Sequence, residues 1–254
     1  MIGIYFSGTG NTRYCVETFM RKYKDNSETY SIEDDNIESY ILKSHEIVFG
    51  YPVQYSQIPK YVKDFIDNHA DLWKGKHIFV IATMGGLFSG DGAGLLARQL
   101  KQYGATIVGG LHLKMPDSIG DEKALKRPLD VNKELVISAT HRIEEAVMNL
   151  KMGQPSQVGL GFFYHLAGLF GQRLYFYNKT KKYNDKLKID ISKCIGCGKC
   201  VELCPMKNID LKAGVATSHH QCTMCYRCVN NCPTMALTVL GKTVIEQSRI
   251  EKYL

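Results

Sequence analysis

Residues 2–12 read Ile-Gly-Ile-Tyr-Phe-Ser-Gly-Thr-Gly-Asn-Thr, and this stretch sets the architecture of the first half of the chain. Its first five residues predict a short apolar strand, and a helical pattern begins near Arg13. The turn between them consists of glycine, hydroxyl and amide residues. Backbone N–H groups in such a turn, together with the positive end of the following helix, favour a bound phosphate. The stretch therefore predicts a phosphate site between a first strand and a first helix.

Two other nucleotide-binding loops fit this turn poorly. A dinucleotide-binding turn would need a third glycine where this chain has Arg13, although Glu33 lies near the distance expected for a ribose-binding acid. A P-loop would need a lysine, and the turn has none. A mononucleotide phosphate is the remaining ligand that fits this turn. Residues 6–12 resemble the FMN phosphate loop of flavodoxins. This resemblance implies FMN contacts from Ser7, Gly8, Thr9, Gly10, Asn11 and Thr12.

Apolar runs alternate with helical patterns over the first 150 residues. Such alternation is typical of a parallel sheet covered on both faces by helices. Together with the resemblance, it predicts an α/β fold, a flavodoxin-like doubly wound parallel sheet with strand order 2-1-3-4-5. Strands are expected at residues 2–6, 28–32, 46–50, 77–83 and 105–113, and helices at 12–23, 58–68, 92–103 and 131–150. Residues 33–44 carry no firm assignment.

The loops after the third and fourth strands complete the predicted site. Ligands of such sheets bind beyond the carboxyl ends of the strands, so these loops are expected to meet the phosphate loop. The resemblance to flavodoxins implies that they embrace a flavin ring, with Tyr55 or Tyr51 on one side and Met84 or Phe88 near the other. The contacts expected from these loops are Tyr51, Pro52, Val53, Gln54, Tyr55, Met84, Gly85, Gly86, Phe88 and Asp91.

Eight of the nine cysteines lie in the last 61 residues, in two runs of Cys-x2-Cys-x2-Cys-x3-Cys-Pro that begin at Cys194 and Cys222. Two-residue gaps let one tight loop present three thiolates to a small inorganic core, and a fourth thiolate comes from elsewhere. A disulfide framework has no reason to repeat this spacing, and zinc sites usually pair cysteines across a longer span. The runs therefore favour iron and sulfur.

Residues 191–236 resemble bacterial two-cluster ferredoxins. The resemblance implies a small α+β domain, two 4Fe-4S clusters and one-electron transfer. In that arrangement the fourth cysteine of each run ligates the other cluster. The expected ligand sets are Cys194, Cys197, Cys200 and Cys232 for one cluster, and Cys222, Cys225, Cys228 and Cys204 for the other.

The composition divides the chain into a flavodoxin-like domain at residues 1–154, an aromatic and basic linker at 155–186 that is expected to be helical, and a two-cluster domain at 187–254. Residues 155–254 hold 14 basic and 6 acidic residues, and two thiolate-held clusters offset about half of this excess. The basic balance therefore indicates no nucleic-acid partner.

The apolar part of the linker is too short for a transmembrane segment. A helix packed between the domains is favoured, while contact with a membrane surface through residues 158–182 stays open.

The whole chain resembles the flavodoxin-ferredoxin fusion proteins of anaerobic bacteria. This resemblance implies a cytoplasmic, low-potential electron carrier that relays electrons between FMN, two clusters and a protein redox partner. The alternative is an FMN-dependent oxidoreductase, fed through the clusters, that reduces a small acceptor such as a quinone or a nitro compound. No acid–base constellation identifies a catalytic residue for it. A cluster-bearing redox sensor is disfavoured by the intact phosphate loop.

Overall fold

The computed structural model describes residues 1–86, 91–168 and 186–254. Phe88, one of the predicted flavin contacts, and residues 169–185 of the predicted linker lie outside the described residues.

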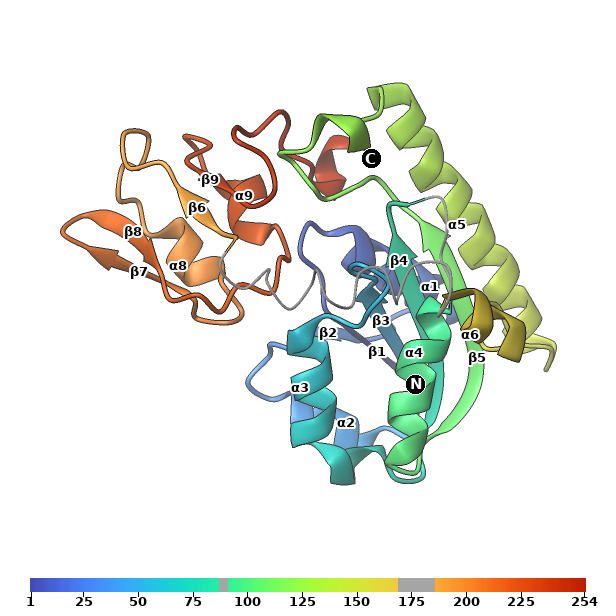
Figure 1. Cartoon of the computed structure of the whole chain (residues 1–254). Coiled ribbons are helices and arrows are strands. Elements are labelled where there is room, and N and C mark those ends of the chain that lie inside the picture. The colour runs from blue at the N-terminus through green and yellow to red at the C-terminus, as the bar shows by residue number, and fades with distance from the viewer. Residues whose placement is uncertain (87–90, 169–185) are drawn as a thin grey trace.

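Five parallel strands form one sheet in the order β2-β1-β3-β4-β5 (Figure 1), so the predicted strand order is confirmed. The central strands β3 and β4 are buried along almost their whole length, because helices cover both faces of the sheet. The strands are β1 (Ile2–Tyr5), β2 (Thr29–Ser31), β3 (Glu46–Pro52), β4 (His77–Met84) and β5 (Thr106–Lys114).

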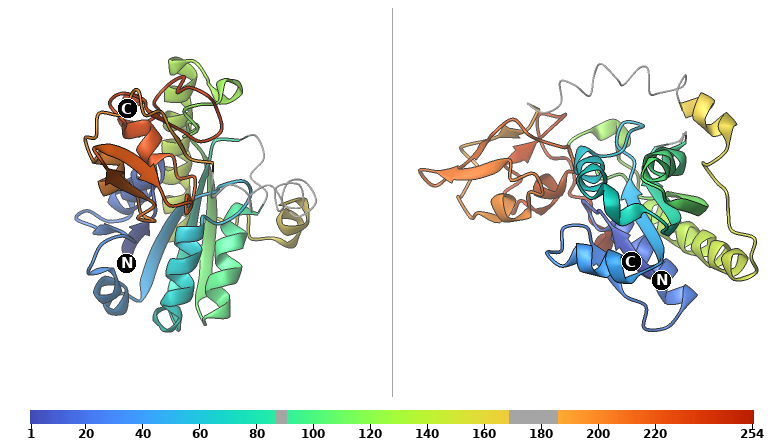
Figure 2. Two further views of the ribbon diagram at one scale, coloured as in Figure 1. Left: turned by 60° about the vertical axis from the view of Figure 1, so that its left-hand side comes forward. Right: turned by 90° about the horizontal axis from the view of Figure 1, so that it is seen from below.

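Two layers of helices enclose this sheet (Figures 1 and 2). One face is covered by α1 (Asn11–Tyr23) and α5 (Leu129–Lys151), and the other by α2 (Ile37–Lys43), α3 (Lys60–Asn68) and α4 (Gly92–Gln102). Aromatic pairs mark both layers: Phe19 packs on Phe79 with ring centroids 5.0 Å apart, and Phe49 packs on Trp73 at 5.8 Å. The helix α2 falls in the stretch that the sequence pattern left unassigned.

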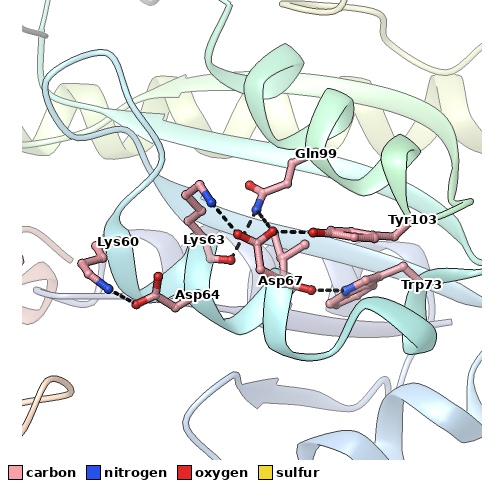
Figure 3. Close-up of polar contacts among 8 residues, drawn as sticks. Lys60, Lys63, Asp64, Asp67, Trp73, Gln99 and Tyr103 are labelled. Atoms are coloured by element: carbon pink, nitrogen blue, oxygen red, sulfur yellow. Dashed lines mark hydrogen bonds and ion pairs between the residues drawn. The ribbon is translucent and has the colours of Figure 1, made fainter.

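A polar network holds α3 beside α4 (Figure 3). The Asp67 carboxylate accepts hydrogen bonds from Gln99 Nε2 at 2.7 Å and from the Tyr103 hydroxyl at 2.8 Å. The Trp73 indole in the 3₁₀ turn η1 (Ala70–Trp73) donates to a carbonyl of α3 at 3.1 Å. Because α3 and α4 follow the loops after β3 and β4, this network helps to fix the positions of those loops.

The chain beyond α5 runs beside the free edge of β5. Gly110 N donates to Ser156 O at 2.7 Å, and Val158 N donates to Gly110 O at 3.1 Å. These bonds cover an edge that would otherwise be open to pairing with another chain. A short helix, α6 (Phe162–Gly168), follows in the described part of the linker. None of the described helices is long and apolar enough to cross a membrane.

The second domain is small and has its own core. Two antiparallel pairs, β6 (Lys188–Ile189) with β9 (Leu237–Thr238) and β7 (Ile209–Lys212) with β8 (Val215–Ser218), frame the short helices α8 (Lys199–Leu203) and α9 (Arg227–Asn231). Its buried apolar residues include Ile209, Val229, Leu237 and Val239. The predicted combination of a doubly wound domain and a small α+β domain is therefore confirmed.

The end of the chain returns to the first domain. Ile250, in the 3₁₀ turn η5 (Ile250–Lys252), and Tyr253 are buried in the core between α1, α5 and the sheet. Ile250 N donates to Thr9 O at 3.0 Å, directly at the predicted phosphate loop. The sequence assigns these residues to the second domain, but their packing joins them to the first. The two domains are therefore tied together by the linker and by the C-terminal segment.

Candidate functional site

The predicted phosphate loop joins β1 to α1 as a tight turn. Gly10 N donates to Ser7 Oγ at 3.1 Å, and Gly10 has a φ of 90°, a conformation that favours glycine. A Cβ at Gly10 would lie 2.3 Å from Ile250 Cγ2, so glycine also lets the C-terminal segment close over the loop. The first N–H groups of α1 have no partners within the helix, and its positive end lies here. The loop therefore provides free N–H donors and a positive helix end, the two features that bind a phosphate group.

A cavity of about 330 Å³, termed the strand-end cavity, opens beside this loop at the carboxyl edge of the sheet. Its size falls in the range of small-molecule sites, about 300–1,000 Å³. The loops after β1, β3 and β4 meet around it, as the sequence predicts. The predicted residues that line it are Ser7, Gly8, Thr9, Asn11, Thr12, Pro52, Val53, Gln54, Tyr55, Met84, Gly85 and Gly86.

Three predicted contacts lie outside this lining. Gly10 faces a neighbouring cleft. Tyr51 is fully buried, and its hydroxyl donates to the carbonyl of Gly92. Asp91 is buried and pairs with Arg98 and with His165, whose Nδ1 lies 2.9 Å from Asp91 Oδ2. Side chains alternate between the two faces of a strand, and Tyr51, within β3, belongs to the core on the α2, α3 and α4 face. The structure therefore places Tyr51 and Asp91 in packing roles beneath the cavity.

The segment after β5 supplies a wall of the cavity that is absent from the predicted contacts. The carboxyl end of β5 lies at the same edge as those of β1, β3 and β4, and the Met-Pro-Asp-Ser stretch that follows it is typical of a loop. Ligands of such sheets bind beyond the carboxyl ends of the strands, and this expectation, termed the strand-end rule, also predicts the wall when it is extended to the fifth strand. The additional lining residues from the first domain are Ser56, Thr83, Met115, Pro116, Asp117, Ser118, Ile119 and Leu125.

Asp117 brings a titratable group to the cavity. Its Oδ1 accepts a hydrogen bond from Ile119 N at 2.8 Å, and a Cβ on Gly85 would lie 2.4 Å from Oδ2. Burial raises the pKa of this carboxyl above its ordinary value, against the lowering effects of the Ile119 N–H and of Lys126 and Arg127. The cavity wall therefore contains a carboxyl group that holds its proton more tightly than an exposed aspartate.

An unusual turn positions Tyr55. Tyr55 and Ser56 have φ values of 48° and 59°, and the turn is closed by two hydrogen bonds between Gln54 and Gln57, of 3.0 and 2.8 Å. Left-handed backbone costs a residue other than glycine about 1–3 kcal/mol, and such strain clusters at functional sites. The turn places Tyr55 in the cavity lining and also against the core of the second domain. Tyr55 therefore joins the cavity to that domain.

The second domain closes the remaining side of the strand-end cavity. Met224, Cys225 and Tyr226, from the loop before α9, line the same cavity. The two backbones approach so closely that a Cβ on Gly8 would lie 2.2 Å from Cys225 O, and Gln54 Nε2 donates to Met224 O at 3.4 Å. No sequence pattern predicts this wall, because it depends on how the domains dock. A predicted cluster ligand thus borders the predicted flavin site.

Asp121 fastens this wall to the first domain. Asp121 is 4% exposed and lies in the segment between β5 and α5. Oδ1 accepts from the Tyr226 hydroxyl at 2.9 Å, and Oδ2 accepts from the backbone N–H groups of Val239, Leu240 and Gly241 at 2.5, 3.0 and 3.1 Å. One buried side chain therefore binds four donors of the second domain.

A partly buried ion pair supports the opposite end of the interface. Arg227 donates through both Nη atoms to the carboxylate of Glu33, at 2.6 Å each, and also to Ser7 O at 2.8 Å. The two side chains are 15% and 22% exposed, so the pair is largely shielded from solvent. Glu33, which stood near the position of a ribose-binding acid, instead anchors the second domain to the phosphate loop.

The eight thiols of the second domain separate into two sets of four. The first thiol set (Cys194, Cys197, Cys200 and Cys232) surrounds one small cavity, and the second thiol set (Cys204, Cys222, Cys225 and Cys228) surrounds another. This grouping is the one that the ferredoxin resemblance implies. Among the described residues, no His, Cys, Asp or Glu group is arranged around a single metal ion. The thiols enclose spaces instead, which fits a core of several iron and sulfur atoms.

Backbone N–H groups point at several of these sulfurs. Asn208 N donates to Cys204 Sγ at 3.3 Å, and Ala236 N donates to Cys232 Sγ at 3.3 Å. Hydrogen bonds to thiolate sulfur stabilise the negative charge of a cluster and tune its reduction potential. Burial raises the pKa of the Cys225 thiol to about 12, so binding of a cationic core at this sulfur has to displace the proton. The thiols therefore fit iron–sulfur clusters.

Two family models match the chain, one in each domain. A flavodoxin domain matches residues 2–92, and a 4Fe-4S dicluster domain matches residues 186–233.

Two curated relatives of the chain are ferredoxins. A ferredoxin of Methanothermococcus thermolithotrophicus is 42% identical over 55 residues, which are 20% of this chain and 92% of the relative. An uncharacterized ferredoxin of Methanocaldococcus jannaschii is 32% identical over 71 residues, which are 25% of this chain and 45% of that protein, so less than half of its length is matched.

Among solved structures, the two-electron reduced flavodoxin of Megasphaera elsdenii is similar to the chain at 22% identity. The match covers 58% of this chain and 99% of the flavodoxin, with a TM-score of 0.42.

Proposed function

Since this chain belongs to the flavodoxin-ferredoxin fusion proteins, we propose that it relays electrons between FMN in the strand-end cavity, two 4Fe-4S clusters and an external redox partner. The membership makes it a flavin and iron–sulfur electron-transfer protein, and the relay is the further step. One observation carries the proposal: Cys225, a member of the second thiol set, also lines the strand-end cavity.

The residues of the cavity suit FMN. The phosphate loop would hold the phosphate through backbone N–H groups and the start of α1, with Ser7 and Thr9 close by. Tyr55 and Met84 line the region beyond the loop, and these two residues would contact an isoalloxazine ring bound there. FMN bound here would exchange two electrons at one site, whereas each cluster would exchange a single electron.

The two thiol sets differ in their distance from this cavity. The second set shares Cys225 with the cavity lining, whereas none of the residues around the first set belongs to that lining. Cys197 of the first set is exposed. We therefore assign an order to the relay, in which the second set holds the inner cluster and the first set holds the outer cluster, which exchanges electrons with the partner.

The docked interface supports this order because it is fixed at several points. Asp121 and the Arg227–Glu33 pair hold the loop of Cys225, termed the inner thiol loop, against the phosphate loop. Asn230 Nδ2 donates to Ser118 O at 2.8 Å, between the two domains. Buried hydrogen-bonded groups of this kind favour one docked arrangement over many. A fixed interface keeps the distance from the inner cluster site to the cavity constant.

The test is an anaerobic preparation in which FMN, iron and sulfide are quantified per chain. The proposal requires one FMN and about eight irons, from two four-iron clusters. After flash reduction of the clusters, an electron should then reach the flavin at a rate independent of protein concentration. Flavin reduction that occurs only in bimolecular collisions would refute the internal relay.

Cys197→Ala tests the order. It should remove the outer cluster and leave flavin binding and inner transfer intact, because Cys197 does not border the strand-end cavity. Cys225→Ala is the matched variant, and it should abolish inner transfer. Retention of all eight irons in Cys197→Ala would contradict the ligand assignment, and loss of inner transfer in that variant would contradict the order.

A further inference from the structure

The first thiol set, which holds the outer cluster in the proposed relay, lies beside the β7–β8 hairpin, since Leu211 and Ala216 of the hairpin line the same cavity. The loop of this set packs against the β7–β8 hairpin, since a Cβ on Gly196 would lie 2.2 Å from Gly214 O. Both Figure 1 and the right-hand view of Figure 2 show this hairpin extending away from the first domain. Cys197 itself is exposed. A cluster held here is therefore accessible to another protein, whereas the strand-end cavity is walled by the inner thiol loop.

Four exposed apolar side chains surround this outer site. Ile191, Ile195, Leu211 and Met235 are 71, 65, 43 and 46% exposed. Ile195 and Leu211 line the cavity of the first thiol set directly. Asp190 N donates to Ala236 O at 2.8 Å, which brings the strand preceding Ile191 beside the segment of Met235. These four residues, termed the outer patch, are exposed apolar side chains on the segments that enclose one redox site, and exposed apolar surface of this kind marks interaction sites.

The charges beside the outer patch are mainly positive. Residues 186–218 contain six lysines and three carboxylates, and the charge of about −2 on an oxidised cluster with four thiolates reduces this positive excess without cancelling it. Two of the carboxylates are engaged: Asp190 with Lys193 at 3.3 Å, and Asp210 with His219 at 2.5 Å. Lys199 and Lys212 are exposed and form no ion pair with the described residues. An apolar centre with free ammonium groups beside it is complementary to a surface that has an apolar centre and carboxylates around it.

The geometry points to the outer patch as the docking surface for an acidic redox protein, which exchanges one electron with the outer cluster. This inference rests on the proposed function, because it identifies the face through which the relay meets its partner. The step moves a single electron between the partner's redox centre and the cluster, with no bond made or broken. Charge complementarity steers such an encounter and raises association rates by about 10- to 1,000-fold at low salt.

The experiment compares two probe proteins, rubredoxin, an acidic one-iron protein, and cytochrome c, a basic haem protein. The reduced holoprotein is mixed anaerobically with each oxidised probe in a stopped-flow instrument. Binding is measured separately by thermophoresis of the oxidised proteins, a readout that needs no electron transfer. The rate and affinity for rubredoxin should exceed those for cytochrome c and should fall as salt rises, because salt screens exposed charges.

Variants locate the surface. Lys199→Glu/Lys212→Glu should weaken rubredoxin binding and slow electron transfer to it by at least about tenfold at low salt. The matched control, Lys101→Glu/Lys133→Glu, makes the same change in net charge on the exposed sides of α4 and α5 and should leave both values within about twofold. Ile191→Ser should weaken binding at low and high salt alike, because it removes apolar contact. Iron content is checked in every variant.

Three outcomes would overturn the inference. Equal effects of the two double variants would show that net charge alone attracts the probe. Stronger binding of cytochrome c would reverse the sign of the surface. Self-association in sedimentation that is lost in Ile191→Ser would assign the outer patch to a second copy of the chain. Failure of the relay itself would appear as absent flavin reduction in the wild type, whereas the oxidised-state binding measurements would still decide the docking surface.

Discussion

Replacement of Asp121 by Ala should undock the second domain from the first. The change removes the acceptor for the hydroxyl of Tyr226 and for the backbone N–H groups of Val239, Leu240 and Gly241. A buried donor left without an acceptor costs about 1–3 kcal/mol. Water can enter the space of the missing carboxylate, so the lower limit applies to each donor. The four donors together then cost about 4 kcal/mol, close to a thousandfold change in the docked population.

Asp121→Asn is the matched control for this prediction. The amide oxygen can still accept from the backbone N–H groups, while the amide NH₂ faces the Tyr226 hydroxyl, which can accept. The negative charge is lost, and hydrogen bonds to charged groups are roughly twice as strong as neutral ones. We therefore expect Asn to cost about half as much as Ala, near 2 kcal/mol.

Two measurements follow the docked state of these variants. Urea unfolding, monitored by cluster absorbance under anaerobic conditions, gives the free energy of unfolding. Flash reduction gives the rate of electron transfer from the inner cluster to the flavin, which should fall in the order wild type, Asn, Ala. If the Ala variant stays within about 0.5 kcal/mol of the wild type and keeps its transfer rate, the Asp121 interface does not control docking and the reasoning fails.

Three further predictions concern the cavity and the first-domain core. Gly8→Ala would place a Cβ 2.2 Å from Cys225 O and should slow inner transfer in a flash-reduction assay, whereas Gly86→Ala, with no neighbouring atom within 4 Å of its Cβ, should not; equal rates would contradict the close approach. His112 accepts from Ala93 N at 2.9 Å, and burial lowers its pKa from 6.5 to about 4, so the imidazole is neutral in the fold. Its contribution to stability is complete above pH 6.5 and is lost as the pH falls towards 4, by about 3 kcal/mol in total, which urea titrations across this range should show in the wild type and not in His112→Gln. The raised pKa of Asp117 means that the fold binds its proton more tightly than the unfolded chain does, so stability declines as the pH rises above 3.8 through the folded pKa. Asp117→Asn should therefore melt at a higher temperature than the wild type at neutral pH, with the difference vanishing in acid; an equal gain at every pH would exclude titration as the cause.

The architecture of the first domain follows from local patterns in the sequence. Apolar runs at strand length, separated by helical periodicity, predict a parallel sheet, and the strand order observed is the expected one. The short helix α2 escaped prediction because its seven residues carry little periodic signal. The phosphate loop and the two cysteine runs were recognisable because their chemistry requires fixed short spacings.

The lining of the strand-end cavity was only partly predictable. The strand-end rule placed the loops after β1, β3 and β4 correctly, since that rule depends on topology alone. It could not separate Tyr55 from Tyr51, four residues apart. The structure separates them through a strained turn that sends Tyr55 to the cavity and through strand alternation that sends Tyr51 to the core.

By itself, the sequence determined the two folds, the phosphate loop and the expected grouping of eight thiols, because each depends on residues close in the chain or on a repeated spacing. Only the tertiary structure decided that the loop of Cys225 lies against Gly8, that Glu33 pairs with Arg227, and that the other thiol set faces outward. These contacts join residues about 200 positions apart. They arise from the fit of one folded surface on another, which no local pattern encodes.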